Sequence, residues 1–228
     1  MVGSFEIAVL CLPSGIALSC YGGQVPRPLS PDVRSRLVER AAQMLARREP
    51  VSLRSLVAGT GVSTMAVYTY FGGMPGLWQA VRQEGFERLS ARLARIEPTT
   101  DPVRDLAAMG VAYTENALAD PDLYRTMFDA AVEAEDPGRA DLGFRAIVEQ
   151  ARRAQQAGRF AADADPEALA LRYWASGHGL VMLVVTGALP EAVLAEQAPR
   201  VAVALFVDAG DDPARCAESV ADAWATTR

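Results

Sequence analysis

The chain has 228 residues, of which half are apolar and 22% are charged, a composition typical of a soluble globular protein with one large or two small domains. One histidine, His178, and three cysteines without ligand spacing argue against multi-histidine metal sites, zinc fingers and a disulfide framework. There is no lysine, which excludes a Gly-x-x-x-x-Gly-Lys phosphate loop. We therefore expect no metal, no cofactor and no catalytic residues.

The net charge of −6 is unevenly distributed along the chain. Residues 31–95 hold ten arginines and five acidic residues, whereas residues 96–228 hold eleven arginines and 22 acidic residues. A basic segment before an acidic one favours contact of the first with a polyanion. The alternative is an ordinary excess of surface arginine.

Residues 1–30 differ from the rest of the chain. Their apolar stretch, residues 7–20, is interrupted by Pro13 and Gly15 and is too short to span a bilayer as a helix. It also lacks the positive start of a signal peptide. We interpret this segment as a disordered or mis-annotated extension of a cytoplasmic protein that has no membrane partner, with export as the less favoured alternative.

Helical patterns begin at Ser30-Pro31, where a capping residue precedes a proline. Apolar residues then recur at helical spacing up to Leu45. Ser52 and Ser63 are predicted to cap two short helices, which are separated by a turn around Gly61. Gly72-Gly73 ends the second of these helices, and a long helix follows over about 75–96.

Beyond Pro98 the pattern remains helical, and no alternating run indicates a sheet. The predicted helices cover residues 103–119, 122–134, 139–157, 166–187, 191–208 and 213–226. The predicted fold class is therefore all-α.

Residues 52–62, with a second short helix that begins at Ser63, have the form of a helix-turn-helix. A glycine in the turn adopts positive φ without strain and lets the two helices cross steeply. The second helix has a polar face that fits a major groove, where hydroxyls reach base edges and methyl groups touch thymine. The spacing alone is also found in helical hairpins that bind no DNA.

Residues 34–81 resemble the DNA-binding domain of the TetR family of bacterial transcriptional regulators, most closely in the stretch Leu53-Arg-Ser-Leu-Val-Ala-Gly-Thr-Gly-Val-Ser-Thr-Met-Ala-Val-Tyr-Thr-Tyr-Phe-Gly-Gly. The resemblance implies DNA contacts by Ser52, Arg54, Ser63, Thr64, Met65, Ala66, Tyr68, Thr69 and Tyr70. The family usually has a lysine where this chain has Met74, which removes an expected phosphate contact.

A second resemblance lies in the C-terminal half. Trp174-Ala-Ser-Gly-His178-Gly179 is similar to the Trp-x-x-x-His-Gly signature of one branch of that family, and residues 122–128 are also similar to it. The likeness implies an all-helical homodimer with an effector pocket in the C-terminal domain. The candidate pocket residues are Met109, Tyr113, Tyr124, Met127, Phe128, Phe144, Trp174, His178 and Met182, although such apolar stripes are more often plain core.

We therefore predict three segments: an extension over 1–30, a three-helix DNA-binding domain over 31–80, and a ligand-binding and dimerisation domain over 81–228 joined to it by the long helix. The expected function is repression, relieved when a small apolar or amphipathic effector releases the homodimer from a palindromic operator on double-stranded DNA. Helices 166–187 and 191–208 are the expected dimer surface. The alternative is a helical ligand-binding or interaction protein that has lost specific DNA binding.

Overall fold

The computed structural model describes residues 31–47, 49–129 and 137–225, and all regular structure in these ranges is α-helical. The predicted all-α class is confirmed. The helices are α1 Pro31–Ala46, α2 Leu53–Val57, α3 Thr64–Phe71, α4 Met74–Leu93, α5 Pro102–Ala119, α6 Pro121–Met127, α7 Pro137–Gln156, α8 Pro166–Val185, α9 Ala192–Asp208 and α10 Pro213–Ala225. The predicted extension, residues 1–30, lies outside the described residues.

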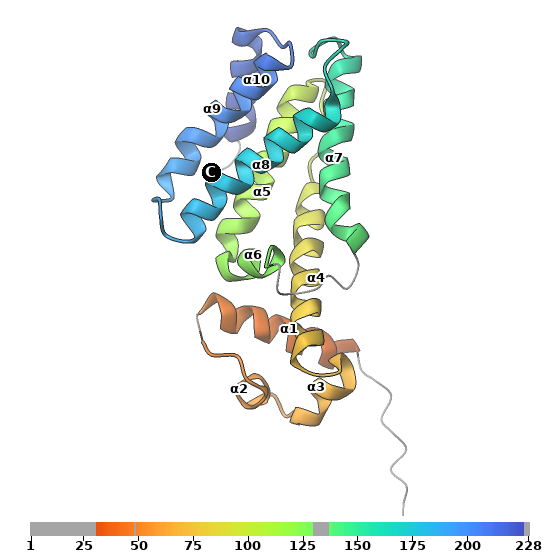
Figure 1. Cartoon of the computed structure of the whole chain (residues 1–228), viewed down its shortest axis with the longest axis vertical. Coiled ribbons are helices and arrows are strands. Elements are labelled where there is room, and N and C mark those ends of the chain that lie inside the picture. The colour runs from red at the N-terminus through yellow and green to blue at the C-terminus, as the bar shows by residue number, and fades with distance from the viewer. Residues whose placement is uncertain (1–30, 48, 130–136, 226–228) are drawn as a thin grey trace, which may run out of the picture.

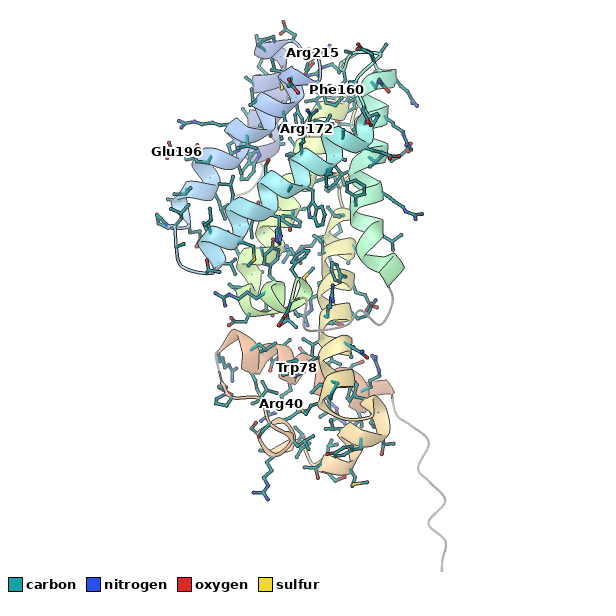
Figure 2. The ribbon with its side chains drawn as sticks, in the orientation of Figure 1. Arg40, Trp78, Phe160, Arg172, Glu196 and Arg215 are labelled. Carbon is teal, nitrogen blue, oxygen red and sulfur yellow. The ribbon has the colours of Figure 1, made fainter. Side chains whose placement is uncertain are left out.

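Helices α1 to α3 form a small group around the first half of α4 (Figure 1). Their shared core consists of fully or almost fully buried aliphatic residues from all four helices: Leu37, Val38, Leu56, Val67, Leu77 and Val81. Arg40 connects α1 to α2, because its guanidinium donates to the Ser55 carbonyl at 3.3 Å (Figure 2).

Local signals in the sequence set the ends of α2 and α3. The Ser52 hydroxyl accepts from the Ser55 backbone N–H, and the Ser55 hydroxyl accepts from the Ser52 N–H, which together form a capping box. Gly61 in the turn has φ of +71°, and Gly72 ends α3 with φ of +70°. Both values favour glycine over any residue with a side chain.

Helices α5 to α10 form a second, larger group, with α5 packed against α7, α8, α9 and α10. Its core holds buried residues from α5, α8, α9 and α10 and from the segment between α7 and α8: Val103, Leu106, Phe160, Leu169, Phe206 and Val220. Helix α4 continues from the first group into this second group (Figure 1). One helix is therefore part of both.

A buried ionic cluster connects the start of α5 with the segment after α7 and the turn before α10. The Arg159 guanidinium donates to both oxygens of Asp211 at 2.7 Å and to Asp101 at 2.6 Å. The Ser219 hydroxyl lies 2.6 Å from the other Asp101 oxygen. Because Asp101 also caps α5 through the Val103 and Arg104 N–H groups, this cluster fixes the start of α5 against α10.

Two predicted helices end three or more residues earlier in the structure. The predicted helix over 122–134 ends at Met127, because Phe128 leaves the helical conformation and packs its ring 4.4 Å from the His178 ring. The predicted helix over 75–96 ends earlier, at Leu93. Ser63 precedes α3 as expected but makes no side-chain capping hydrogen bond.

Helix α8 is, among the described helices, the one long and apolar enough to cross a membrane by length and composition. It packs against α7 and α9. Its outer side carries exposed Leu171, Ala175, Gly179 and Leu183, spaced four residues apart. This spacing places them on one face of the helix.

Candidate functional site

The outer face of α3 is exposed at one end of the molecule. Met65 is 65% exposed and Tyr68 is 51% exposed, although both are large side chains. Val67, on the opposite face, is fully buried in the core of α1 to α4. Since nothing in the described chain covers Met65 and Tyr68, this face is available for contact with another molecule.

The nine residues predicted to contact DNA fall into two sets. The exposed ones are Ser52, Arg54, Ser63, Met65, Tyr68 and Thr69, and the half-buried ones are Thr64, Ala66 and Tyr70. Two of the exposed hydroxyls already take part in local bonds: Ser52 caps α2, and Thr69 donates to the Met65 carbonyl at 2.9 Å. Tyr70 packs against Phe71, with ring centroids 6.3 Å apart.

Tyr68 also lies next to the start of α4. Its ring is the side chain nearest to Gly73, the N-cap of that helix. The first N–H groups of a helix have no intrahelical acceptor and attract anions. Met74, in the place where the resemblance expects lysine, is half-buried and packs on the core. Because Pro75 has no N–H, the helix end offers the backbone N–H groups of Met74 and Gly76 together with Tyr68, but no lysine side chain.

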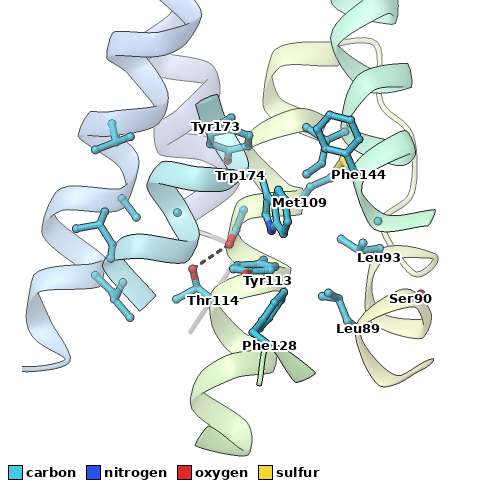
Figure 3. A pocket seen from close by; sticks show the side chains of 18 of the residues that line it. Leu89, Ser90, Leu93, Met109, Tyr113, Thr114, Phe128, Phe144, Tyr173 and Trp174 are labelled. Carbon is cyan, nitrogen blue, oxygen red and sulfur yellow. Dashed lines mark hydrogen bonds between the residues drawn. The ribbon is translucent and has the colours of Figure 1, made fainter. Parts of the chain in front are cut away.

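A cavity of about 210 Å³ lies inside the larger helical group, between α4, α5, α7, α8 and α9 (Figure 3). Most of its wall is apolar or aromatic. Residues that form this wall are Phe86, Leu89, Leu93, Met109, Phe128, Phe144, Ile147, Tyr173, Trp174, Leu180, Leu194 and Trp224. Space for one aromatic ring with small substituents is thus enclosed by side chains that match it in polarity.

A cluster of three polar side chains stands at one side of this cavity. Tyr113 Oη lies 2.7 Å from Tyr124 Oη and 2.9 Å from His178 Nδ1, and Tyr124 Oη lies 2.7 Å from the same nitrogen. Of the three residues, Tyr113 is the one that lines the cavity. A ligand in the cavity would therefore contact this cluster through Tyr113.

Burial keeps all three members of the cluster uncharged near neutral pH. It raises the pKa of Tyr113 to about 12, and it also raises the pKa of Tyr124. It lowers the pKa of His178 below its usual 6.5. The cluster therefore offers hydrogen bonds without a formal charge.

The nine predicted pocket residues are placed in three settings. Met109, Tyr113, Phe128, Phe144 and Trp174 line the cavity. Tyr124 and His178 stand behind Tyr113, in the polar cluster. Met127 and Met182 are not among the lining residues.

Met127 is instead fully buried against Gly85 of α4. Met182 packs at the edge of a separate apolar cluster around Val181 and Val185. Spacing along α6 and α8 could not separate these positions from the wall, because both helices are apolar on more than one side.

Several wall residues were not predicted as ligand contacts. Phe86, Leu89 and Leu93 form part of the apolar stripe of α4, but the sequence gives no sign that this stripe faces a void. Trp224 comes from α10, and its buried indole N–H has no hydrogen-bond partner among the described residues. An isolated tryptophan near the chain end carries no signal that would assign it to the cavity.

Helix α6 connects the cavity to the exposed end of the molecule. Leu123 is buried in the core of α1 to α4, whereas the next residue, Tyr124, belongs to the polar cluster. Arg125 holds the same helix to α8 by donating to the Val185 carbonyl. A displacement at the cavity can therefore reach α1 and α4 through one short helix.

No group of three or more histidine, cysteine, aspartate or glutamate side chains that could hold a metal ion occurs in the described parts of the chain.

Comparison with known proteins gives one family match and a consistent fold. Residues 106–209 match the family model described as the tetracyclin repressor-like C-terminal domain. No curated protein matches the chain.

Similar solved structures cover most of this chain. A protein of unknown function from Rhodococcus sp. RHA1 is 26% identical, with a TM-score of 0.69 over 82% of this chain and all of the other. RolR in complex with its ligand resorcinol is 19% identical, with a TM-score of 0.61 over 83% of this chain and 93% of the other. A bacterial regulatory protein of the tetR family from Rhodococcus RHA1 is 17% identical, with a TM-score of 0.60 over 80% of this chain and all of the other.

Proposed function

We propose that this chain is a TetR-family repressor which binds a palindromic operator as a homodimer and leaves it when a small effector occupies the cavity. The match of residues 106–209 to the tetracyclin repressor-like C-terminal domain and the shared fold support this proposal. The exposed face of α3 carries this proposal. A monomeric protein would gain nothing from leaving Met65 and Tyr68 in solvent, whereas a major groove accepts both.

The proposed DNA contacts divide by chemistry. Met65 and Thr69 would touch base edges, and Arg54, Tyr68 and the N-terminus of α4 would bind phosphates. The half-buried Ala66 and Tyr70 would support this surface more than contact the DNA. With no lysine at position 74, backbone N–H groups would carry a larger share of the phosphate binding.

The proposed homodimer forms through α8 and α9. Exposed Leu171 and Leu183 lie on one side of α8, and small residues between them allow another helix to approach closely. Charged pairs border this surface: Arg172 with Asp208 at 3.4 Å and Arg200 with Glu196 at 2.9 Å (Figure 2). An apolar centre with a polar rim is the usual anatomy of an interface.

The proposed effector is a small molecule of low polarity, because the cavity wall is mainly apolar and aromatic. The similar structures include RolR with resorcinol and a γ-butyrolactone receptor, so both ligand types are suitable first probes. The effector would favour the state of the dimer in which the two α3 helices no longer fit successive major grooves. Helix α6 is the proposed connection between the two sites.

Binding to labelled DNA from the region flanking the gene tests this function. We expect binding that survives excess unrelated DNA and weakens steeply as salt rises, since phosphate contacts release counterions. The Met65→Ala, Tyr68→Ala double variant should lose at least about tenfold in affinity. Leu142→Ala, at a leucine that is 54% exposed on α7, is the matched control and should bind as the unmodified protein does.

Two results would contradict the repressor function. The first is equal binding to unrelated DNA and to any fragment of the genome. The second is specific binding that the double variant retains in full. A folded homodimer with no DNA preference would instead favour a helical ligand-binding or interaction protein.

A further inference from the structure

The polar cluster beside the cavity restricts which hydrogen bond a ligand can make there. Tyr113 and Tyr124 direct their hydroxyls at each other and at a single nitrogen, His178 Nδ1, over distances of 2.7 to 2.9 Å. Two phenolic protons and one imidazole nitrogen must share these contacts. The number of protons in the cluster decides whether Tyr113 can donate a hydrogen bond to a ligand or accept one from it.

With the imidazole proton on Nε2, Nδ1 accepts and both phenolic protons are used inside the cluster. Tyr124 donates to Nδ1 and Tyr113 donates to Tyr124, or the two tyrosines exchange roles. With the proton on Nδ1, one phenolic O–H is left without an acceptor in the cluster, which costs free energy. The first arrangement pairs both O–H groups inside the cluster, and His178 Nε2 is not among the buried polar atoms that lack a partner. Tyr113 Oη is then an acceptor without a free proton, and the Trp174 side chain also hydrogen-bonds with it.

Among the described residues that line the cavity, the charged side chain is Arg82. Burial holds His178 in its neutral form by lowering its pKa. The Arg82 guanidinium lies 5.9 Å from the ring centroid of Phe86, another wall residue, and it also has a further partner. An anionic ligand would lose its hydration here and would have to compete with the existing partners of Arg82 for its charge.

Trp224 offers a hydrogen-bond donor at another part of the wall, whereas Tyr113 offers an acceptor. Its indole N–H is buried and has no acceptor among the described residues. A ligand oxygen that accepts from it would satisfy a donor that is otherwise unpaired.

Resting on the effector role proposed above, we propose that this cavity is a binding site for uncharged phenols. The aromatic ring lies among Phe128, Phe144 and Trp174, and the phenolic O–H donates to Tyr113 Oη. A second oxygen on the ring accepts from Trp224. Ethers and carboxylates of the same size are rejected, because neither supplies the proton that Tyr113 requires.

Three probes with one ring and one constant methoxy group test this assignment: 3-methoxyphenol, 1,3-dimethoxybenzene and 3-methoxybenzoate. Their affinities for the full-length protein are measured by calorimetry, supported by ligand-observed NMR for weak binding. We expect the phenol to bind about tenfold or more tightly than either of the other two. In the Tyr113→Phe variant, the affinity for 3-methoxyphenol should fall to the affinity for 1,3-dimethoxybenzene.

Tyr173→Phe is the matched control, since it removes a hydroxyl from the same wall. The Tyr173 hydroxyl lies against the Gly110 backbone and outside the polar cluster. This variant should therefore keep the preference for the phenol. Circular dichroism and thermal melting confirm that both variants are folded before affinities are compared.

The inference is overturned if the ether binds as well as the phenol, if the benzoate binds best, or if the folded protein binds none of the probes. Operator binding measured on the same preparation separates this result from the repressor function. DNA binding without a preference for the phenol refutes the ligand class alone. A preference for the phenol without any DNA binding refutes the repressor function alone.

Discussion

Leu123 and Tyr124 are adjacent in the chain, yet each is buried in a different part of the molecule. Leu123 is 3% exposed and packs with the core of α1 to α4. Tyr124 is 1% exposed, and its hydroxyl lies 2.7 Å from His178 Nδ1 beside the cavity. One peptide bond therefore separates the core that supports the exposed face of α3 from the polar cluster beside the ligand cavity.

Tyr124→Phe should separate ligand binding from release of DNA. Without this hydroxyl, Tyr113 can still donate to His178 Nδ1 at 2.9 Å, so effector affinity should change by no more than about threefold. Helix α6 loses its polar attachment to the cavity, and release from the operator should need about tenfold more effector. Calorimetry for the effector and a DNA-release titration measure the two quantities separately. Release at the same effector occupancy as in the unmodified protein would show that this bond carries no coupling.

Arg159→Met should destabilise the larger helical group. The change leaves Asp101 and Asp211 facing each other without their shared cation in a buried site. Loss of one partner from a buried ionic cluster costs about 3 to 5 kcal/mol. Arg200→Met breaks an ion pair whose side chains are 67% and 60% exposed, and should cost less than about 1 kcal/mol. Chemical denaturation of both variants provides the comparison, and similar losses would contradict the structural role of the buried cluster.

The free energy of unfolding should decrease as the pH is lowered, and part of this decrease should depend on His178. Burial places the folded-state pKa of His178 below 6.5, so as pH falls past 6.5 the unfolded chain takes up a proton that the folded protein does not. This contribution is complete above 6.5 and decreases toward the folded-state pKa. The stability difference between the unmodified protein and His178→Gln should therefore shift in favour of the variant between pH 7 and pH 5. Urea denaturation at constant ionic strength measures it, and parallel pH profiles would contradict the prediction.

Leu183→Glu should shift the protein from dimer toward monomer. Leu183 is 45% exposed on the outer face of α8, and a carboxylate there would be desolvated by the partner subunit in the proposed dimer. We expect at least a hundredfold weaker dimerisation in analytical ultracentrifugation, with operator affinity reduced in parallel. Leu142→Glu changes a leucine that is 54% exposed on α7 and should leave the dimer intact. A Leu183→Glu protein that remains dimeric would place the interface elsewhere.

The helices were predictable because their local signals agree with their packing. Ser52 forms the expected cap, Gly72 ends α3 as expected, and prolines stand at the starts of α5, α6 and α8. The end of α6 was not predictable, since Phe128 leaves the helix for a contact with His178 that lies 50 residues away in sequence.

The residues that face the cavity were harder to predict from the sequence than the helix ends. Aromatic residues such as Tyr113 and Trp174 could be selected by type, but whether a side chain faces a void depends on how several helices pack together. The sharing of one imidazole nitrogen by two tyrosines is a three-dimensional fact, because the three residues come from α5, α6 and α8. Only the chemical types of these residues were visible in the chain.

Helix α4 belongs both to the core that supports α3 and to the wall of the cavity. This double role restricts how the protein can change over evolutionary time. Leu77 and Val81 lie in the core that supports α3, and Phe86 and Leu89, one and two turns further on, line the cavity. A new side chain on α4 that suits a different ligand also risks moving α3. Helix α7 contributes Phe144 and Ile147 to the same wall and packs on α4, α5 and α8. Relatives that respond to new molecules while keeping their operators should therefore differ first along α7.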